Sequence, residues 1–231
     1  MDQLRSPTLS SIKEVPGLFI SDRFSARAVA NIKSHNIVRI LSLVSPEEVP
    51  RFEDSVAVEI RNINIDDDPT EDILEHLQDA YDWIQDGLNH RSEGTPNSTP
   101  GVLVHCLQGI SRSGSFIVAF LMRKLELPFS TALDLARESR PIICPNEGFK
   151  VQLQIWGNCC YDIHHEKEET VEGKKEKPAY KAWKDNRDNL VKQRVEDVNR
   201  ARFLSMATMA AHFGKRRQEI NGPKKAAETR D

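Results

Sequence analysis

A short apolar run followed by a loop of small residues and a longer apolar segment constrains the fold most strongly. Residues 102–104 are Val, Leu and Val, a continuous run typical of a strand that is buried on both faces. Residues 116–125 have the composition of a largely buried helix. A buried strand next to a buried helix needs further elements on each side. The sequence therefore predicts an α/β fold with a central, mostly parallel sheet flanked by helices.

The neighbouring segments alternate between strand-like and helix-like patterns, which supports the same fold. Short strands are expected at residues 17–20, 37–43 and 56–65. Helical spacing occupies residues 25–34, a segment from the N-cap Thr70 to about residue 90, a segment capped by Ser130 that ends near 139, and residues 146–164. Residues 91–101 are rich in Gly, Pro, Ser, Thr and Asn and predict an exposed loop.

The charge of the chain is divided unevenly. The net charge of -3 combines an excess of acidic residues up to Ile163 with an excess of basic residues beyond it. We expect an N-terminal arm (1–14), a main domain (15–165), a charged linker (166–177), an amphipathic helix (178–214) and a basic, disordered tail (215–231). Such a tail favours an acidic partner, nucleic acid included, although most basic tails only solubilise a chain.

Two exclusions follow from hydropathy and cysteine content. No apolar run approaches the roughly 18 to 20 residues that span a bilayer, and Met1–Ser11 lacks the apolar stretch of a secretory signal. We therefore expect a protein of the cytoplasm or the nucleus, where the four cysteines stay reduced. Each cysteine must then be interpreted as a thiol, a ligand or a nucleophile.

The segment between the buried strand and the buried helix combines a nucleophile with an anion site. Cys106 ends the strand, and Arg112 follows after five intervening residues at the start of the helix. Backbone N–H groups of a tight loop and the positive end of a helix can hold a phosphate. Gly109 permits a positive φ angle, and the guanidinium of Arg112 can grip two phosphate oxygens. The positive electrostatic field of these N–H groups, the helix end and Arg112 is also expected to lower the pKa of the Cys106 thiol.

The side chains around this loop have separate expected roles. The predicted phosphate-binding residues are Leu107, Gln108, Gly109, Ile110, Ser111 and Arg112. Ser113 is expected to donate a hydrogen bond to the Cys106 sulfur. This bond would help the sulfur to leave when a phosphocysteine is hydrolysed. His105 should support the loop structurally, because neighbours on a strand point to opposite sides. A buried core thiol is the alternative for Cys106, but the combined spacing of His, Cys, Gly, Arg and Ser makes coincidence improbable.

The segment Val104–Gly114 resembles the signature of the cysteine-dependent dual-specificity protein phosphatases. Residues 16–20 and 140–153 also resemble this family, so that the similarity covers about residues 15–160. The resemblance implies that residues 15–165 are a catalytic domain. It further implies hydrolysis of phosphotyrosine and phosphoserine or phosphothreonine through a phosphocysteine intermediate, with a phosphorylated protein as substrate and with no metal or other cofactor.

Such enzymes also need a general acid on a loop upstream of the signature. Asp66, Asp67 and Asp68 lie between a predicted strand and a predicted helix. Alignment with the family places Asp67 in the position of the acid, with Asp66 and Asp68 as alternatives one residue away. A solvated turn at a helix N-terminus is the structural interpretation of the same three residues.

A metal site is not expected. Cys160 and His164 stand four residues apart, but no second pair has the spacing that completes a tetrahedral zinc site.

Other functions stay open at this point. The same chemistry could act on the 5′-triphosphate of RNA or on a phosphoinositide, and a site with unsuitable geometry would give a non-catalytic phospho-binding module. The helix at 178–214 could bind a partner as an adaptor or pack back on the body.

Overall fold

A computed structural model describes residues 8–90, 99–170 and 173–189 of the chain. Five strands form one sheet in the order β1-β2-β5-β3-β4. Strand β1 is antiparallel to β2, and the other pairings are parallel. The strands are β1 (Ser10–Ser11), β2 (Leu18–Ser21), β3 (Ile37–Ser42), β4 (Glu59–Asn62) and β5 (Gly101–His105). The predicted α/β fold with a mostly parallel sheet is therefore confirmed.

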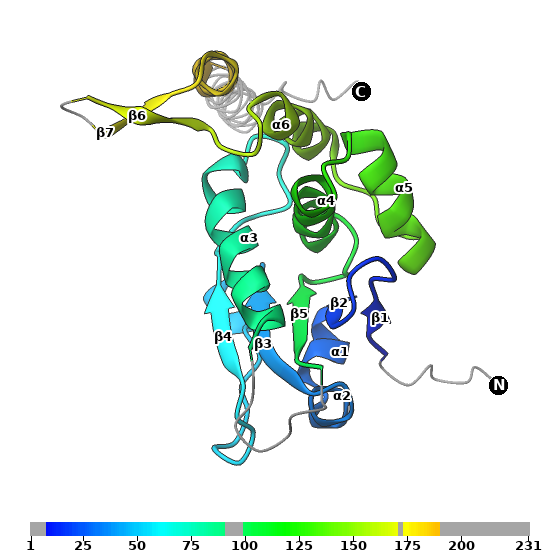
Figure 1. The fold of residues 1–231 in the computed structure, drawn as a ribbon. Helices are drawn as coiled ribbons and strands as arrows, with labels where there is room; N and C mark the ends of the chain where they lie inside the picture. The colour runs from blue at the N-terminus through cyan, green and yellow to red at the C-terminus, as the bar shows by residue number, and fades with distance from the viewer. Residues whose placement is uncertain (1–7, 91–98, 171–172, 190–231) are drawn as a thin grey trace, which may run out of the picture. The chain divides into compact units, whose positions relative to one another are not determined.

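Helices cover both faces of β5, which explains its continuous apolar run (Figure 1). On one face Leu103 packs with Ile40, and with residues of α1 and α2. On the other face Val102 lies so close to α3 that a Cβ at Gly87 would meet it. The helices are α1 (Arg23–Arg27), α2 (Val29–Ser34), α3 (Leu74–Leu88), α4 (Arg112–Lys124), α5 (Phe129–Ser139) and α6 (Glu147–Asn158), and a 3-10 turn η1 (Pro46–Glu48) follows β3.

Helix α4 lies at the centre of the helical layer. Its residues from Arg112 to Met122 are all buried. The helix begins four residues before the apolar segment that predicts it, because the small and polar residues of its first turn are buried as well. The start of α4 therefore lies inside the molecule, next to the end of β5.

The helix predicted at residues 25–34 is in fact two helices. Ala28 has an extended conformation, with φ -77° and ψ 107°, which separates α1 from α2. The Asp22 carboxylate caps α1 by accepting a hydrogen bond of 2.8 Å from the backbone N–H of Ser25. The chain is thus redirected at the carboxyl end of β2, and α1 becomes a separate short element there.

Two predicted N-caps are wrong. Thr70 does not cap a helix: its N–H and its hydroxyl both donate to Oδ1 of Asp68, at 2.8 and 2.7 Å, and helix α3 begins only at Leu74. Aspartate side chains stabilise such tight turns, which compete with helix formation. Helix α5 begins one residue before Ser130, with Pro128 in the cap position.

Parts of the predicted arm and of the predicted linker pair in β-sheets. Ser10–Ser11 join the sheet and Ile12 is buried, although residues 1–14 were expected to form an arm. The predicted linker 166–177 overlaps an antiparallel hairpin of β6 (His164–Thr170) and β7 (Gly173–Glu176). Helix α6 ends at Asn158 rather than near 164, because Cys160 and Tyr161 have φ angles of 52° and 60°. Charged composition did not prevent backbone pairing in the hairpin.

The chain divides into two compact units, residues 1–182 and 183–231. The first contains the sheet, its helices and the hairpin. Residues 178–189 are helical, within the predicted segment 178–214, and the rest of that segment and the tail 215–231 lie outside the described residues. None of the described helices combines the length and the apolar character needed to cross a membrane.

Candidate active site

Cys106 lies directly after β5, and its side chain is only 2 % exposed. Its sulfur accepts hydrogen bonds from the backbone N–H of Gly109 at 3.2 Å and from the hydroxyl of Ser113 at 3.3 Å. Burial raises the pKa of the thiol, but hydrogen bonds from the Ser113 hydroxyl and from the N–H groups of Ser113, Ile110 and Gly109 outweigh this effect. The pKa of Cys106 is therefore lowered, which favours the thiolate.

The loop 106–111 is held by its neighbours on both sides. Gly109 has a φ of +70°, and a Cβ at this position would lie 2.6 Å from the carbonyl oxygen of Ser21 at the end of β2. Only glycine fits this combination of conformation and space. From the other side, Nε of Arg140 donates to the carbonyl oxygen of Gly109 at 2.8 Å and Nη2 donates to that of Gln108 at 3.2 Å. These bonds hold the loop by its carbonyl groups, while the N–H of Gly109 donates to the Cys106 sulfur.

Arg112 is buried next to the segment that follows β4. We name the residues Asp66–Asp68 in this segment the aspartate loop. Its Nη1 donates to the carbonyl oxygen of Ile65 at 3.1 Å, directly before Asp66. Its Nε is buried and has no hydrogen-bond acceptor. A buried N–H group without an acceptor is uncommon, and a bound anion would supply one. Arg112 therefore joins the cysteine loop to the aspartate loop and retains donors for a ligand.

Asp67 is the aspartate that lines the same cavity as Cys106 and Arg112. Oδ1 of Asp67 accepts a hydrogen bond of 2.6 Å from the hydroxyl of Ser111. Asp66 does not line this cavity, and neither does Asp68, whose carboxylate is occupied in the turn with Thr70. Of the three candidates, Asp67 alone shares this cavity with Cys106 and Arg112, and its role as the acid stays a prediction.

Asn146 is a site residue that the sequence analysis did not single out. Its Nδ2 donates to Oδ1 of Asp67 at 2.9 Å, and its N–H donates to the Ser111 hydroxyl at 3.1 Å. Its own Oδ1 caps α6 by accepting from the N–H of Phe149 at 2.9 Å. The capping role was visible as an Asn at the start of a helical segment. No local sequence pattern indicated its hydrogen bond to Asp67, which lies 79 positions earlier in the chain.

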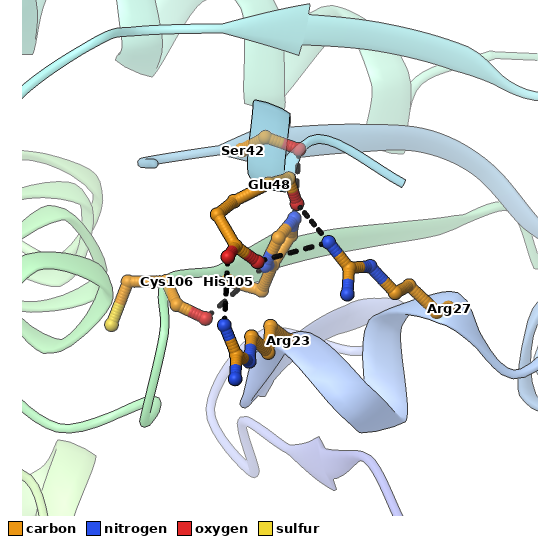
Figure 2. Close-up of polar contacts among 6 residues, drawn as sticks. All are labelled: Arg23, Arg27, Ser42, Glu48, His105 and Cys106. Atoms are coloured by element: carbon orange, nitrogen blue, oxygen red, sulfur yellow. Dashed lines mark hydrogen bonds and ion pairs between the residues drawn. The ribbon is translucent and has the colours of Figure 1, made fainter. Parts of the chain in front are cut away.

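His105 supports the loop from within the sheet, as Figure 2 shows. Its Nε2 lies 2.7 Å from the hydroxyl of Ser42 on β3, and its Nδ1 lies 3.3 Å from the carbonyl oxygen of Cys106. Desolvation by burial lowers its pKa to about 4, so the ring is neutral near pH 7. The geometry agrees with a supporting role, and Ser42 is a second residue that sequence spacing did not indicate.

These residues enclose a cavity of about 260 Å³. It is lined by Asp67, Cys106, Leu107, Gln108, Ile110, Ser111 and Arg112. Five of the six residues predicted to bind phosphate, all except Gly109, thus line one cavity together with Cys106 and Asp67. A volume of this order suits a phosphate group with part of the side chain that carries it. The arrangement can hold an anion, attack it with sulfur and supply a proton.

The other cysteines are separate from this cavity. Cys159 is buried, whereas Cys144 and Cys160 are exposed. The N–H of Cys144 donates to the carbonyl oxygen of Ile110 at 3.1 Å, so its backbone braces the loop. Within the described ranges, no three His, Cys, Asp or Glu residues are grouped in a way that could hold a metal ion.

Comparison with known proteins agrees with this geometry. Residues 18–159 match the family model "Dual specificity phosphatase, catalytic domain". The chain belongs to this family. Dual specificity protein phosphatase 13B of Mus musculus is 33 % identical over 159 residues, which cover 67 % of this chain and 76 % of that protein. The crystal structure of the Yvh1 phosphatase domain from Chaetomium thermophilum has 35 % identity and a TM-score of 0.59, and covers 67 % of this chain and 99 % of that domain.

Several relatives within the family are longer than the matched region. Dual specificity protein phosphatase MPK-4 of Drosophila melanogaster is 34 % identical over 147 residues, which cover 63 % of this chain and 36 % of that protein. Among the curated relatives, three Dictyostelium discoideum probable dual specificity protein phosphatases are matched over 60 %, 59 % and 21 % of their lengths. The shared region is thus the dual specificity phosphatase catalytic domain.

Proposed function

We propose that the protein hydrolyses phosphate esters of tyrosine and of serine or threonine in proteins, through a phosphocysteine intermediate on Cys106. The observation that carries this proposal is the sulfur of Cys106, which accepts hydrogen bonds from Gly109 and Ser113 in a cavity shared with Arg112 and Asp67. This chemistry needs three groups: a thiolate nucleophile, donors that bind the phosphate, and a general acid.

In the first step the Cys106 thiolate attacks phosphorus, and the bond from phosphorus to the substrate oxygen breaks. Loop N–H groups and the Arg112 guanidinium bind the phosphoryl oxygens, where charge develops in the transition state. Asp67 gives its proton to the leaving oxygen. Both hydrogen bonds to Asp67 end on Oδ1, which leaves Oδ2 to carry that proton.

In the second step Asp67, now a carboxylate, takes a proton from water, and the water oxygen attacks phosphorus. The bond from phosphorus to sulfur breaks and the thiolate of Cys106 leaves. The hydroxyl of Ser113 stabilises this leaving group, since it already donates to the sulfur. Phosphate is released and the thiolate is restored.

The test is hydrolysis of a small aryl phosphate in the presence of a chelator. We expect activity in the native chain, none in Cys106→Ser, and a loss of about 10² to 10⁴ in kcat for Asp67→Ala. Asp66→Ala and Asp68→Ala are the matched controls and should keep most of the activity. Failure of freshly reduced native protein to hydrolyse the ester would contradict the proposal and would favour a phospho-binding module.

The substrate class is tested separately. The side chains of Leu107, Gln108, Ile110 and Ser111 are uncharged, which argues against a highly charged phosphoinositide head group. We expect phosphopeptides to be better substrates than either a phosphoinositide or a 5′-triphosphorylated RNA. A higher kcat/KM on the RNA would overturn this choice of substrate and leave the mechanism intact.

We also propose that the chain works in the cytoplasm or the nucleus and that its basic segment 215–231 binds an acidic partner. The support is the cluster of Lys and Arg in that segment. Microscopy of the tagged full chain, compared with a chain that ends at residue 214, tests the compartment. Loss of nuclear signal on truncation is the expected result.

A further inference from the structure

The mouth of the Cys106 cavity has an apolar margin that the proposed mechanism does not use. Six large hydrophobic side chains are exposed among the described residues: Phe24, Val29, Leu107, Leu125, Ile142 and Val151. Leu107 lines the cavity itself and is 36 % exposed. Phe24, at 64 %, is the most exposed of the six. Apolar surface that is contiguous and exposed marks a binding site, whereas single exposed apolar side chains do not, so the position of Phe24 relative to Leu107 decides its meaning.

The backbone places Phe24 next to Leu107. The N–H of Arg23 donates to the carbonyl oxygen of Leu107 at 3.2 Å, which ties the first turn of α1 to the cysteine loop. Just before this turn, the carbonyl oxygen of Ser21 lies against Gly109. Phe24 follows Arg23 directly, so its backbone lies close to the loop that encloses the cavity, and its side chain is exposed to solvent. We name Phe24 and Leu107 together the apolar rim.

Ion pairs fix the position of the rim and cancel the charge near it. Arg23 donates to Oε1 of Glu48 at 2.8 Å, and Arg27 contacts Oε2 of the same residue at 3.0 Å (Figure 2). The guanidinium of Arg23 also lies over the ring of Phe24, 4.7 Å from its centroid. The charges of Arg23 and Arg27 are thus balanced by the carboxylates of Glu48 and of Asp22, which caps α1. The surface beside the cavity is therefore held in place and has no net charge from this cluster.

We propose that the apolar rim binds an apolar side chain that flanks the phosphorylated residue of a protein substrate. This inference rests on the proposed function and adds a specificity determinant to it. When the phosphate occupies the loop, the neighbouring residues of an extended peptide must cross the mouth of the cavity. An apolar side chain there would cover Phe24 and Leu107 and remove apolar surface from water. An acidic side chain would find no unpaired cation in the Arg23 and Arg27 cluster.

The experiment compares two phosphotyrosine peptides that differ only at the residues flanking the phosphotyrosine, leucine in one and serine in the other. We expect the native chain to prefer the leucine peptide about tenfold in kcat/KM. Phe24→Ala should abolish most of this preference, and Phe24→Leu should retain part of it. Hydrolysis of a small aryl phosphate by Phe24→Ala should be unchanged, because the ring is not part of the phosphate site.

Leu125→Ala is the matched control, because Leu125 is 37 % exposed but lies at the opposite end of α4 from the cysteine loop. It should keep the native preference. A preference that survives Phe24→Ala unchanged would overturn the inference, as would a native chain that favours the serine peptide or an acidic one.

Binding of the same peptides to a Cys106→Ser chain separates the rim from catalysis. Fluorescence anisotropy should show tighter binding of the leucine peptide, and adding Phe24→Ala should remove that difference. If the native chain binds selectively but does not hydrolyse, the proposed function fails and the rim stands. If it hydrolyses both peptides equally well and binds them equally tightly, the rim fails and the proposed function stands.

Discussion

The hydroxyl of Ser113 is the side chain that does most to keep Cys106 in its thiolate form. Hydrogen bonds from this residue are the largest of the effects that lower the pKa of the thiol against its burial. Ser113→Ala should therefore raise the pKa of Cys106. The pH at which Cys106 becomes reactive toward iodoacetamide should move upward accordingly. Because Cys144 and Cys160 are exposed, the rate must be followed on the Cys106 peptide by mass spectrometry.

Ser115→Ala is the control for this measurement. Ser115 is also buried in the first turns of α4, but its hydroxyl donates to the carbonyl oxygen of Ser111 at 2.8 Å rather than to sulfur. The pH profile of Cys106 should stay unchanged in that variant. An equal shift in both variants would mean that the first turn of α4, and not the Ser113 hydroxyl, controls the thiol.

His105 should make the stability of the fold sensitive to acid. Its pKa falls from 6.5 to about 4 on folding because burial penalises the charged ring. The unfolded chain therefore takes up a proton below pH 6.5, while the folded chain does so only near pH 4. This contribution to the free energy of unfolding is complete above pH 6.5 and is lost as the pH falls through that window, by about 3 kcal/mol in total. Urea unfolding at pH 7 and at pH 4.5 measures it.

The comparison uses His105→Gln, whose side chain does not titrate. This variant should be less stable at pH 7, because the bond to Ser42 is disturbed. Its stability should nevertheless depend less steeply on pH between 6.5 and 4 than that of the native chain. Parallel pH dependence in the two proteins would rule out His105 as the responsible group.

Short-range spacing was sufficient to predict part of the site. Cys106, Arg112 and Ser113 lie within one loop and one helical turn, so a strand that leads into a helix brings them together whatever surrounds them. Asn146 and Arg140 reach the same site from more than thirty residues away. Their contributions depend on how α5 and α6 pack, which residue spacing does not encode. The role of Asp67 stays a prediction, although it alone of three adjacent aspartates lines the cavity.

The first turn of α6 determines where the aspartate loop lies. A Cβ at Gly148 would collide with the carbonyl oxygen of Pro69, two residues after Asp67. Gly148→Ala should push the loop away from the cavity and lower kcat for an aryl phosphate. The backbone of Pro69 cannot yield as a flexible side chain would, so we also expect a loss of about 1 to 3 kcal/mol in the free energy of unfolding.

The same helix offers a matched control. At Gly157 an added Cβ would meet the end of the Met122 side chain at 3.2 Å, a flexible group that can move. Gly157→Ala should leave kcat unchanged and should alter stability little, because alanine favours helix formation. Equal loss of activity in both variants would show that α6 tolerates no added methyl group, and would remove the link to the aspartate loop.

The presence of a helix or strand with a clear hydrophobic periodicity was easier to predict than the residues at which it begins and ends. The buried run at residues 102–104 became β5, and the segment at 116–125 became most of α4. The division at Ala28 had no glycine or proline to mark it. The hairpin from His164 to Glu176 was missed because its sequence is highly charged and lacks the alternation of a half-buried strand.

The folded unit extends beyond the matched region 18–159. Tyr180 is fully buried, and its hydroxyl lies 2.9 Å from Oδ2 of Asp72 and 3.0 Å from Oε1 of Glu75, at the start of α3. Burial and these carboxylates raise the pKa of the phenol. Tyr180→Phe should lower the free energy of unfolding by about 1 to 2 kcal/mol, since it removes a buried donor from charged acceptors. Denaturant titration of the full chain measures the loss.

Tyr161→Phe provides the control for Tyr180→Phe. Tyr161 is partly exposed, and Tyr161→Phe removes only its hydroxyl group. Its removal should change stability by less than about 0.5 kcal/mol. If Tyr180→Phe and Tyr161→Phe were equally stable, the hydrogen bonds of the Tyr180 hydroxyl would not contribute to the stability of the core.

The burial of α4 also determines how activity is lost on heating. The helix that begins at Arg112 is enclosed by the sheet and by other helices over most of its length, and such segments exchange their amide hydrogens only when the whole domain opens. Its first residue, Arg112, binds the phosphate in the proposed mechanism. Arg112 can therefore not leave the site through local unfolding of α4 while the remainder of the unit stays folded. Loss of catalysis and loss of the tertiary circular dichroism signal should then follow a single transition with one midpoint.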